Sequence, residues 1–233
     1  MTFAPLRSTP LFALLVVSSL AGCGGDDNGG GGGGVAGGGA LPPASLELTL
    51  QPATIQLGQN STLSWTSDAG NTCTASGDWT GQQPSSGTRT ITPTATGTQT
   101  FTLTCSGSGY SGEATRTATL TVGAATLAQV QASIFTPRCT LCHDGSQPPN
   151  GFLPGSMNLT AGATFASLVN VASVERAGVL RVVPGNPDAS YLVHKLEGAA
   201  GIVGQRMPFG GPFLDAAAMA QVRSWIAAGA TNN

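Results

Sequence analysis

The pattern of apolar and polar residues divides the chain into four successive segments. Residues 11–20 are mainly apolar and carry no charge, and residues 24–40 show no apolar period. From residue 45 to about 123, short runs alternate between apolar and polar positions, whereas after residue 124 apolar positions recur every three to four residues. Alternation is typical of strands with one buried face, and the longer spacing is typical of amphipathic helices. We therefore expect two folded regions of different class.

Residues 45–123 are predicted to form an all-β sandwich. Turn residues separate the alternating runs, and 20 of these 79 residues are threonine, a residue that favours strands. Six or seven short strands in a segment of this length are typical of an antiparallel sandwich. The apolar positions that share one face are Leu46, Leu48 and Leu50, then Leu63 and Trp65, then Phe101, Leu103 and Cys105, and finally Ala118, Leu120 and Val122.

Residues 124–233 are predicted to be all-α. Asn186 and Asp215 are residue types that begin helices, and Gly198 and Gly229 are of the type that ends them. We expect helices over residues 126–135, 189–197 and 216–228, where apolar side chains have helical spacing. The segments that follow from these patterns are residues 1–22, 23–44, 45–123 and 124–233.

Composition narrows the classes of function. Only 9% of the residues are charged, the formal net charge is −2, and Lys195 is the single lysine. This balance excludes a nucleic-acid binder that works by neutralising phosphates. Apolar residues make up 40% of the chain, which argues against general disorder. A surface built from threonine, serine, glycine and asparagine is common among exported proteins.

The first of the five cysteines follows an export segment. Arg7 precedes the apolar run, which suits a secretory signal and is too short to span a bilayer. The sequence Leu20-Ala21-Gly22-Cys23 resembles a bacterial lipobox, which implies a signal peptide over 1–22 and a lipid anchor on Cys23. An ordinary signal peptide with a nearby cysteine is the alternative. Residues 23–44 would be a flexible glycine-rich linker. The resemblance implies the cell envelope, with Gly24 favouring the outer membrane, on its periplasmic or its surface side.

Cys73 and Cys105 are expected to form a disulfide. An exported protein enters an oxidising compartment, and Cys105 has the inward parity of Phe101 and Leu103. The segment resembles bacterial immunoglobulin-like extracellular modules, with Trp65 before Cys73 and Thr-Leu-Thr-Cys105 on a late strand. It departs from antibody domains, in which the core tryptophan lies between the two cysteines. The resemblance implies the architecture, and because the segment carries no recognisable catalytic set of residues, we expect it to be a spacer or docking module.

The remaining cysteines carry the strongest chemical signal. Cys139-Thr140-Leu141-Cys142-His143 is a C-x-x-C-H sequence, the attachment motif of c-type haem. Two thiols three residues apart on a helical turn can form thioethers with the two vinyl groups of one haem. His143 then presents its imidazole to the iron. The alternatives are a zinc half-site, a thioredoxin-like redox pair and a plain disulfide, but zinc requires a second ligand pair and the only other histidine is His194.

The helical layout around this motif resembles class I cytochromes c. More narrowly, the sequences Pro184-Gly185-Asn186-Pro187-Asp188-Ala189-Ser190-Tyr191-Leu192 and Arg206-Met207-Pro208-Phe209-Gly210-Gly211 resemble cytochrome c domains of planctomycete and related bacterial surface proteins. The resemblance implies that Met207 is the distal iron ligand. The other candidates for that position are Met157, Met219 and His194, or an open site. Arg181 and Arg206 are candidates to pair with the haem propionates.

The sequence as a whole predicts a multidomain lipoprotein, in which an immunoglobulin-like all-β sandwich precedes an all-α cytochrome c-like domain. Its expected cofactor is one covalent haem c, held by Cys139, Cys142, His143 and Met207. We expect one-electron transfer to redox partner proteins rather than catalysis, because both axial positions of the iron would be filled. The alternatives are an open-site haem enzyme or gas-binding module, and a surface adhesion lipoprotein with an accessory haem domain.

Overall fold

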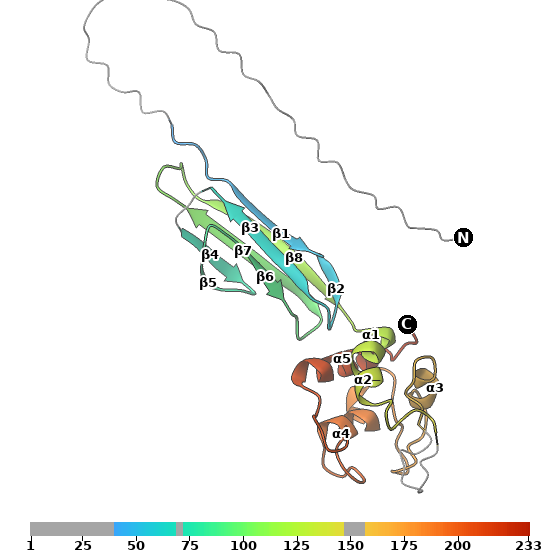
Figure 1. The fold of residues 1–233 in the computed structure, drawn as a ribbon. Coiled ribbons are helices and arrows are strands. Elements are labelled where there is room, and N and C mark those ends of the chain that lie inside the picture. The colour runs from blue at the N-terminus through green and yellow to red at the C-terminus, as the bar shows by residue number, and fades with distance from the viewer. Residues whose placement is uncertain (1–39, 69–71, 147–156) are drawn as a thin grey trace, which may run out of the picture. The chain divides into compact units, whose positions relative to one another are not determined.

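The structure is a computed structural model that describes residues 40–68, 72–146 and 157–233. The predicted signal peptide, the lipidation site Cys23 and most of the predicted linker lie outside the described residues. Within them, strands come first along the chain and helices follow (Figure 1). The strands are β1 (Leu46–Gln51), β2 (Thr54–Gln56), β3 (Ser61–Ser67), β4 (Thr72–Gly77), β5 (Gly81–Gln83), β6 (Ser86–Ile91), β7 (Gly97–Ser106) and β8 (Ala114–Gly123).

These strands form two sheets. One has the order β1-β3-β6 and the other has the order β2-β8-β7-β4-β5. All pairs are antiparallel except β2 and β8, which are parallel, so the expectation of a purely antiparallel arrangement is wrong at this edge. The residues predicted to share a buried face do so: Leu63, Leu103 and Leu120 are fully buried. Threonines of β7 and β8 lie opposite one another on the other face, where the hydroxyls of Thr102 and Thr117 are 3.0 Å apart.

The predicted disulfide between Cys73 and Cys105 is confirmed. The two residues lie directly opposite one another in β4 and β7, and both are buried. The bond therefore joins neighbouring strands of one sheet, whereas the disulfide typical of antibody domains joins the two sheets. Trp79 packs edge-on against both Trp65 and Phe101, with ring centroids 5.3 and 6.4 Å apart. The tryptophans and the disulfide together form the centre of this core.

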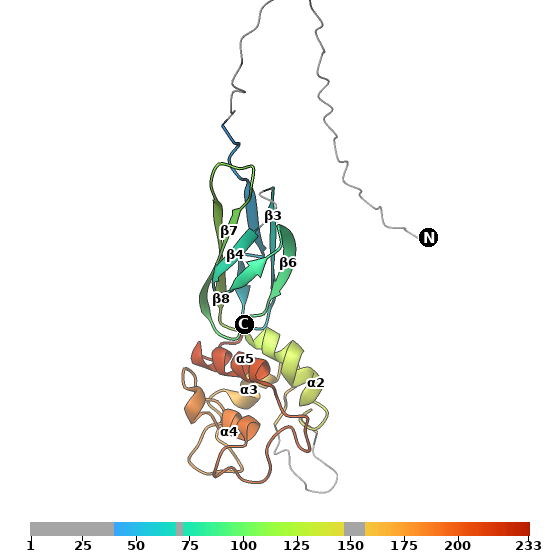
Figure 2. The same ribbon diagram turned by 90° about the vertical axis from the view of Figure 1, so that its left-hand side faces the viewer.

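Helices occupy only part of residues 124–233 (Figure 1 and Figure 2). A continuous helical run begins the region, and α5 is the longest element, with 12 residues. The elements are α1 (Leu127–Val130), the π-helical η1 (Gln131–Phe135), α2 (Thr136–Arg138), α3 (Thr164–Leu168), the 3-10 turn η2 (Pro187–Ala189), α4 (Tyr191–Glu197) and α5 (Ala216–Ala227).

The expectation of an all-α cytochrome c-like domain is wrong. Strands account for 33% and helices for 22% of the structure, and α3 and α4 have only five and seven residues. Between α3 and η2 the chain forms isolated β-bridges, such as that of Val169 with Val182. Valines disfavour helices there, and Gly178, Pro184 and Gly185 interrupt them. The three expected helices therefore do not make the whole region all-α, because the sequence between them does not favour helices.

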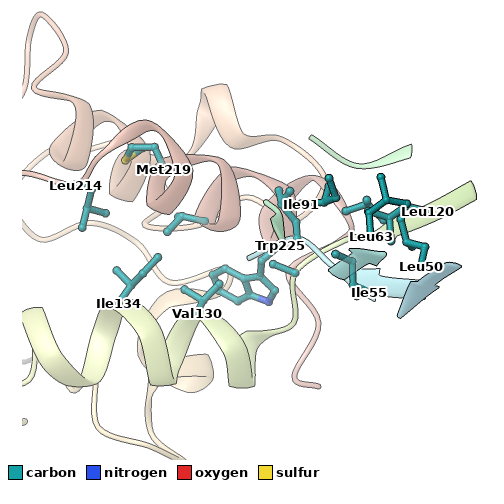
Figure 3. Packing of buried hydrophobic residues seen from close by; sticks show 14 of the residues in the cluster. Leu50, Ile55, Leu63, Ile91, Leu120, Val130, Ile134, Leu214, Met219 and Trp225 are labelled. Atoms are coloured by element: carbon teal, nitrogen blue, oxygen red, sulfur yellow. The ribbon is translucent and has the colours of Figure 1, made fainter. Parts of the chain in front are cut away.

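The predicted helix ends at Asp215 and Gly198 are confirmed, whereas Asn186 caps the 3-10 turn η2 and α4 begins only at Tyr191. Thr126 and Gln129 form a reciprocal capping box at the start of α1, and the Asp215 carboxylate accepts a hydrogen bond from Ala218 N at the start of α5. Gly198 ends α4 in a left-handed conformation, with φ of 72°. Figure 3 shows Trp225 of α5 and Val130 of α1 directed toward one another in the buried core.

A search of the described residues for membrane spans finds no helix with the length and hydropathy needed to cross a bilayer.

The disulfide is expected to stabilise the β-rich part of the chain. Replacing Cys73 and Cys105 together by alanine removes a link between residues 32 apart. The chain-entropy model predicts that the free energy of unfolding falls by about 3–4 kcal/mol. Denaturant unfolding followed by circular dichroism measures this loss. The wild-type chain with a reductant should show the same loss, and the double variant should not respond to the reductant. A loss below about 1 kcal/mol would contradict the prediction.

Candidate functional site

The helical run α1–η1–α2 ends directly in the C-x-x-C-H motif. Cys139 N and Thr140 N both donate hydrogen bonds to Phe135 O, at 2.9 and 3.1 Å. The chain then turns once more, because His143 N donates to Cys139 O at 2.9 Å and Cys142 N donates to the same oxygen at 3.2 Å. These bonds hold the two thiols and the imidazole on a single helical turn, as the spacing of the motif predicts.

The two thiols of the motif differ in their surroundings. They are not bonded to each other; Cys139 is half-buried and Cys142 is exposed. Burial raises the pKa of the Cys139 thiol to about 11, against a smaller opposing effect of the Arg138 charge. Cys139 Sγ lies 3.9 Å from Ile134 O, within the same helical run. Cys139 is therefore a protonated thiol at neutral pH, directed into the interior of the region.

The motif forms one side of a cavity of about 740 Å³. This volume lies in the range of sites for small molecules and cofactors, about 300–1,000 Å³. Cys139, Cys142 and His143 all line it, and so does Met207. Most of the remaining surface is apolar and comes from Phe135, Leu141, Met157, Leu159, Leu168, Leu192, Leu196 and Phe209.

Met207 reaches the cavity from a loop between α4 and α5. Its backbone N–H donates to Lys195 O at 2.8 Å, and the Nε atom of Arg206 donates to Leu196 O at 2.8 Å. Two successive loop residues are thus tied to two successive carbonyls in the last turn of α4. Because the helix has no internal partners for its last carbonyls, this turn offers acceptors for the loop.

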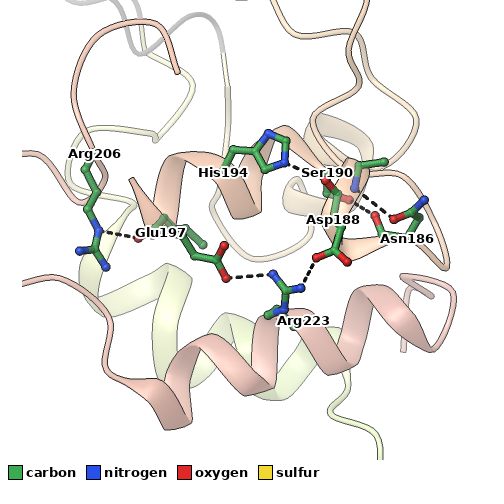
Figure 4. A network of polar contacts seen from close by, with 9 residues as sticks. Asn186, Asp188, Ser190, His194, Glu197, Arg206 and Arg223 are labelled. Carbon is green, nitrogen blue, oxygen red and sulfur yellow. Dashed lines mark hydrogen bonds and ion pairs between the residues drawn. The ribbon is translucent and has the colours of Figure 1, made fainter. Parts of the chain in front are cut away.

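Met157 also lines the cavity, but from the same side as the motif. Leu159 N donates to His143 O at 2.7 Å, and Asp144 and Asn158 form an isolated antiparallel bridge. Met157 therefore belongs to a segment that pairs with the backbone just after the motif. Of the other candidates, Met219 is buried in α5 and His194 bonds Asp188 O through Nε2 at 2.7 Å (Figure 4). Neither belongs to the described residues that line the cavity.

Buried polar groups form another part of the lining. Arg181 donates from a guanidinium N–H to Ser167 O at 2.7 Å, and burial lowers the pKa of its guanidinium. The sequence also made Arg206 a candidate to pair with haem propionates. The structure does not support this role, because Arg206 does not line the cavity and instead lies over the Phe213 ring. Arg181 is the arginine of the pair that is placed to meet a bound carboxylate.

Sequence reasoning missed two polar residues of this lining, Tyr191 and Lys195. Both are buried, and they are four residues apart on α4, a spacing that puts them on one helix face. Lys195 Nζ lies 3.1 Å from a Glu175 carboxylate oxygen and donates to Val203 O at 2.7 Å. The Tyr191 hydroxyl accepts a hydrogen bond from Val203 N at 2.9 Å. The sequence signal that could have identified them is their four-residue spacing within the predicted helix.

The cavity brings several kinds of chemical group together. Two thiols and an imidazole lie on one turn, a thioether comes from a separate segment, and the surface between them is apolar. Arg181, Lys195 and Tyr191 supply buried donors for carboxylates. Across residues 40–68, 72–146 and 157–233, no group of three or more His, Cys, Asp or Glu side chains is arranged to hold a metal ion by itself.

A scan against models of known protein families finds no match to this chain, and a search of curated proteins finds no relative at a significant level of similarity. The functional interpretation therefore depends on the residues of the cavity and on their geometry.

The two thiols are expected to react at different rates in the haem-free protein. At pH 8 about one Cys139 thiol in a thousand is ionised for a pKa of about 11, and the thiolate is the nucleophile. Iodoacetamide should therefore modify the exposed Cys142 first, and the rate at Cys139 should rise about tenfold for each pH unit up to pH 11. Mass spectrometry of the peptides measures both rates. Equal rates at pH 8 would contradict the prediction.

Proposed function

We propose that this chain is a lipid-anchored c-type cytochrome that carries single electrons through one covalently attached haem. The observation that supports this most is the convergence of Cys139, Cys142, His143 and Met207 on one apolar cavity. A zinc half-site does not explain the apolar lining, since zinc sites take Cys, His or carboxylate ligands in a compact tetrahedral group. A cavity of this size beside the two thiols suits a large planar cofactor.

In this proposal the haem supplies an iron that changes its charge by one electron. The chain holds the group in place through the two thiols, which remain close together because Cys142 N and His143 N share Cys139 O as acceptor. His143 presents its imidazole from the same turn. The apolar side chains exclude water, and Arg181, Lys195 and Tyr191 are placed to receive the carboxylates. The ligands, the burial and the hydrogen bonds of such a site set its reduction potential.

Met207 is the better candidate than Met157 for the second axial ligand. A second protein ligand to a bound haem would have to come from a segment other than the one that carries His143. Met157 belongs to the segment that pairs with the backbone beside His143, through the bond from Leu159 N to His143 O. Met207 comes from a separate loop that is anchored on α4. If a haem is bound, His143 and Met207 would therefore hold its iron from two separate segments of the chain.

If His143 and Met207 both held the iron, the site would favour electron transfer over catalysis, because the iron would offer no position to a substrate. A methionine ligand raises the reduction potential relative to ligation by two histidines. The cell envelope is the proposed location, with Cys23 as the lipid attachment site. A lipid anchor with more than one acyl chain gives stable membrane attachment, and a glycine-rich linker leaves the haem free to meet its partners. The proposed partners are redox proteins that dock transiently.

The test of the proposal is the spectrum of the purified holoprotein and of Met207→Ala. The wild-type protein should show the bands of haem c and a near-infrared charge-transfer band from methionine to ferric iron. Met207→Ala should lose the near-infrared band, gain carbon monoxide binding in the reduced form, and have a potential lower by on the order of 0.1 V. The matched control Met157→Ala removes the other methionine of the cavity and should leave the band intact.

Each outcome separates one interpretation from another. A protein without covalent haem would overturn the proposal as a whole. A wild-type protein that binds carbon monoxide readily would favour an open-site haem protein. Loss of the near-infrared band in Met157→Ala, with the band retained in Met207→Ala, would transfer the ligand role to Met157.

A further inference from the structure

Met207 is carried by a loop that has little regular structure of its own. The loop between α4 and α5 contains Gly201, Gly204, Gly210 and Gly211, all with positive φ. Glycines lose more backbone freedom on ordering than other residues do, so such a loop is ordered only where outside contacts fix it. A thioether that binds iron needs a fixed position, because the supporting contacts of a metal ligand govern its affinity.

Arg206, the residue before Met207, makes such contacts on both sides of the ligand in the sequence. Its Nε donates to Leu196 O at 2.8 Å (Figure 4). Its guanidinium carbon lies 4.1 Å from the centre of the Phe213 ring. The guanidinium thus connects the last turn of α4, before the ligand, to Phe213, after it. The adjacent hydrogen bond from Met207 N to Lys195 O at 2.8 Å continues the same attachment.

The end of α4 is shaped to admit the Arg206 side chain. A Cβ atom at position 198 would lie 2.8 Å from Arg206 Cδ and 3.2 Å from its Cγ. Gly198 also has φ of 72°, a conformation that favours glycine. The aliphatic stem of Arg206 therefore packs directly on the backbone of the helix end, which restricts the path of the chain into Met207.

We propose that Arg206 is the positioning residue of the axial ligand, and that it fixes Met207 by bonding Leu196 O while it stacks on Phe213. This inference rests on the proposed function, in which Met207 binds the iron. Arg206 does not line the cavity, so it would act on the ligand through the backbone of its neighbour. Arginine suits this role because its planar group donates a hydrogen bond and stacks on an aromatic ring at the same time, whereas lysine is a point charge.

The test measures how easily imidazole displaces the methionine ligand from the ferric holoprotein. If Met207 is held less firmly, a larger fraction of the iron is open to imidazole. The apparent affinity for imidazole then rises by the same factor. Arg206→Ala should increase the apparent imidazole affinity about tenfold and weaken the near-infrared band. Arg206→Lys and Phe213→Leu, which each keep part of the contact set, should give smaller increases. Met207→Ala, which removes the ligand altogether, should give the largest increase in apparent imidazole affinity.

Arg223→Ala is the matched control. Arg223 is also a cation between α4 and α5, and it pairs with Asp188 and Glu197 at the surface (Figure 4). Its loss should leave the imidazole affinity unchanged. A thermal melt of each variant reports general destabilisation. If Arg206→Ala lowers the melting temperature while its imidazole affinity stays at the wild-type value, the positioning role is overturned.

The remaining outcomes are distinguishable. A wild-type holoprotein without the methionine band would overturn the proposed function and this inference together. A wild-type protein with the band, and Arg206 variants with unchanged affinity, would overturn the inference alone. If Arg206→Ala yields no folded holoprotein, Arg206→Lys and Phe213→Leu decide, and wild-type affinity in both overturns the positioning role.

Discussion

The turn that His143 N closes on Cys139 O is the interaction on which the rest of the candidate site depends. It follows a helical run whose buried face includes Val130, Ile134 and Phe135. Phe135 meets Trp225 of α5 edge-on, with ring centroids 6.4 Å apart. Because aromatic contacts of this kind bury large areas, the run is fixed in orientation before the motif begins. The two thiols and the imidazole inherit that orientation from the hydrogen bonds of one turn.

Helix α4 provides the second fixed point of the cavity. Leu192 and Leu196 face the cavity, while its last carbonyls hold Arg206 and Met207. Arg223 of α5 is bonded to Glu197 at 2.9 Å and to Asp188 on η2, so surface ion pairs also connect α5 to the last turn of α4 and to the 3-10 turn that precedes it. Such exposed pairs contribute little individually, and the apolar contacts carry most of the stabilisation. The cavity is therefore bounded by two helical segments that are each anchored on α5.

Local signals in the sequence predicted the features that depend on near neighbours. The alternation around Leu63, Leu103 and Leu120 and the cap at Asp215 are of this kind, and so is the turn of the C-x-x-C-H motif. The all-α expectation failed because residues 169–186 form isolated β-bridges with one another, which no helical period reveals. The same limit applies to the site. Sequence identified Met207 and Met157 as candidates, but only the pairing of Leu159 with His143 separates the segments that carry them.

The two described pairs of cysteines show that surroundings, and not the number of thiols, decide their chemistry. Strand pairing places Cys73 and Cys105 directly opposite one another in a buried core, and they form a disulfide. Cys139 and Cys142 are much closer in sequence, yet the turn separates them into a half-buried thiol and an exposed one, and they remain unbonded. A pair that only stabilised the chain would gain little from a three-residue loop, since the benefit of a crosslink grows with the length of the loop that it closes. The position of Cys139 and Cys142 at the edge of an apolar cavity, beside an imidazole, is accounted for if their partner is a group that enters that cavity.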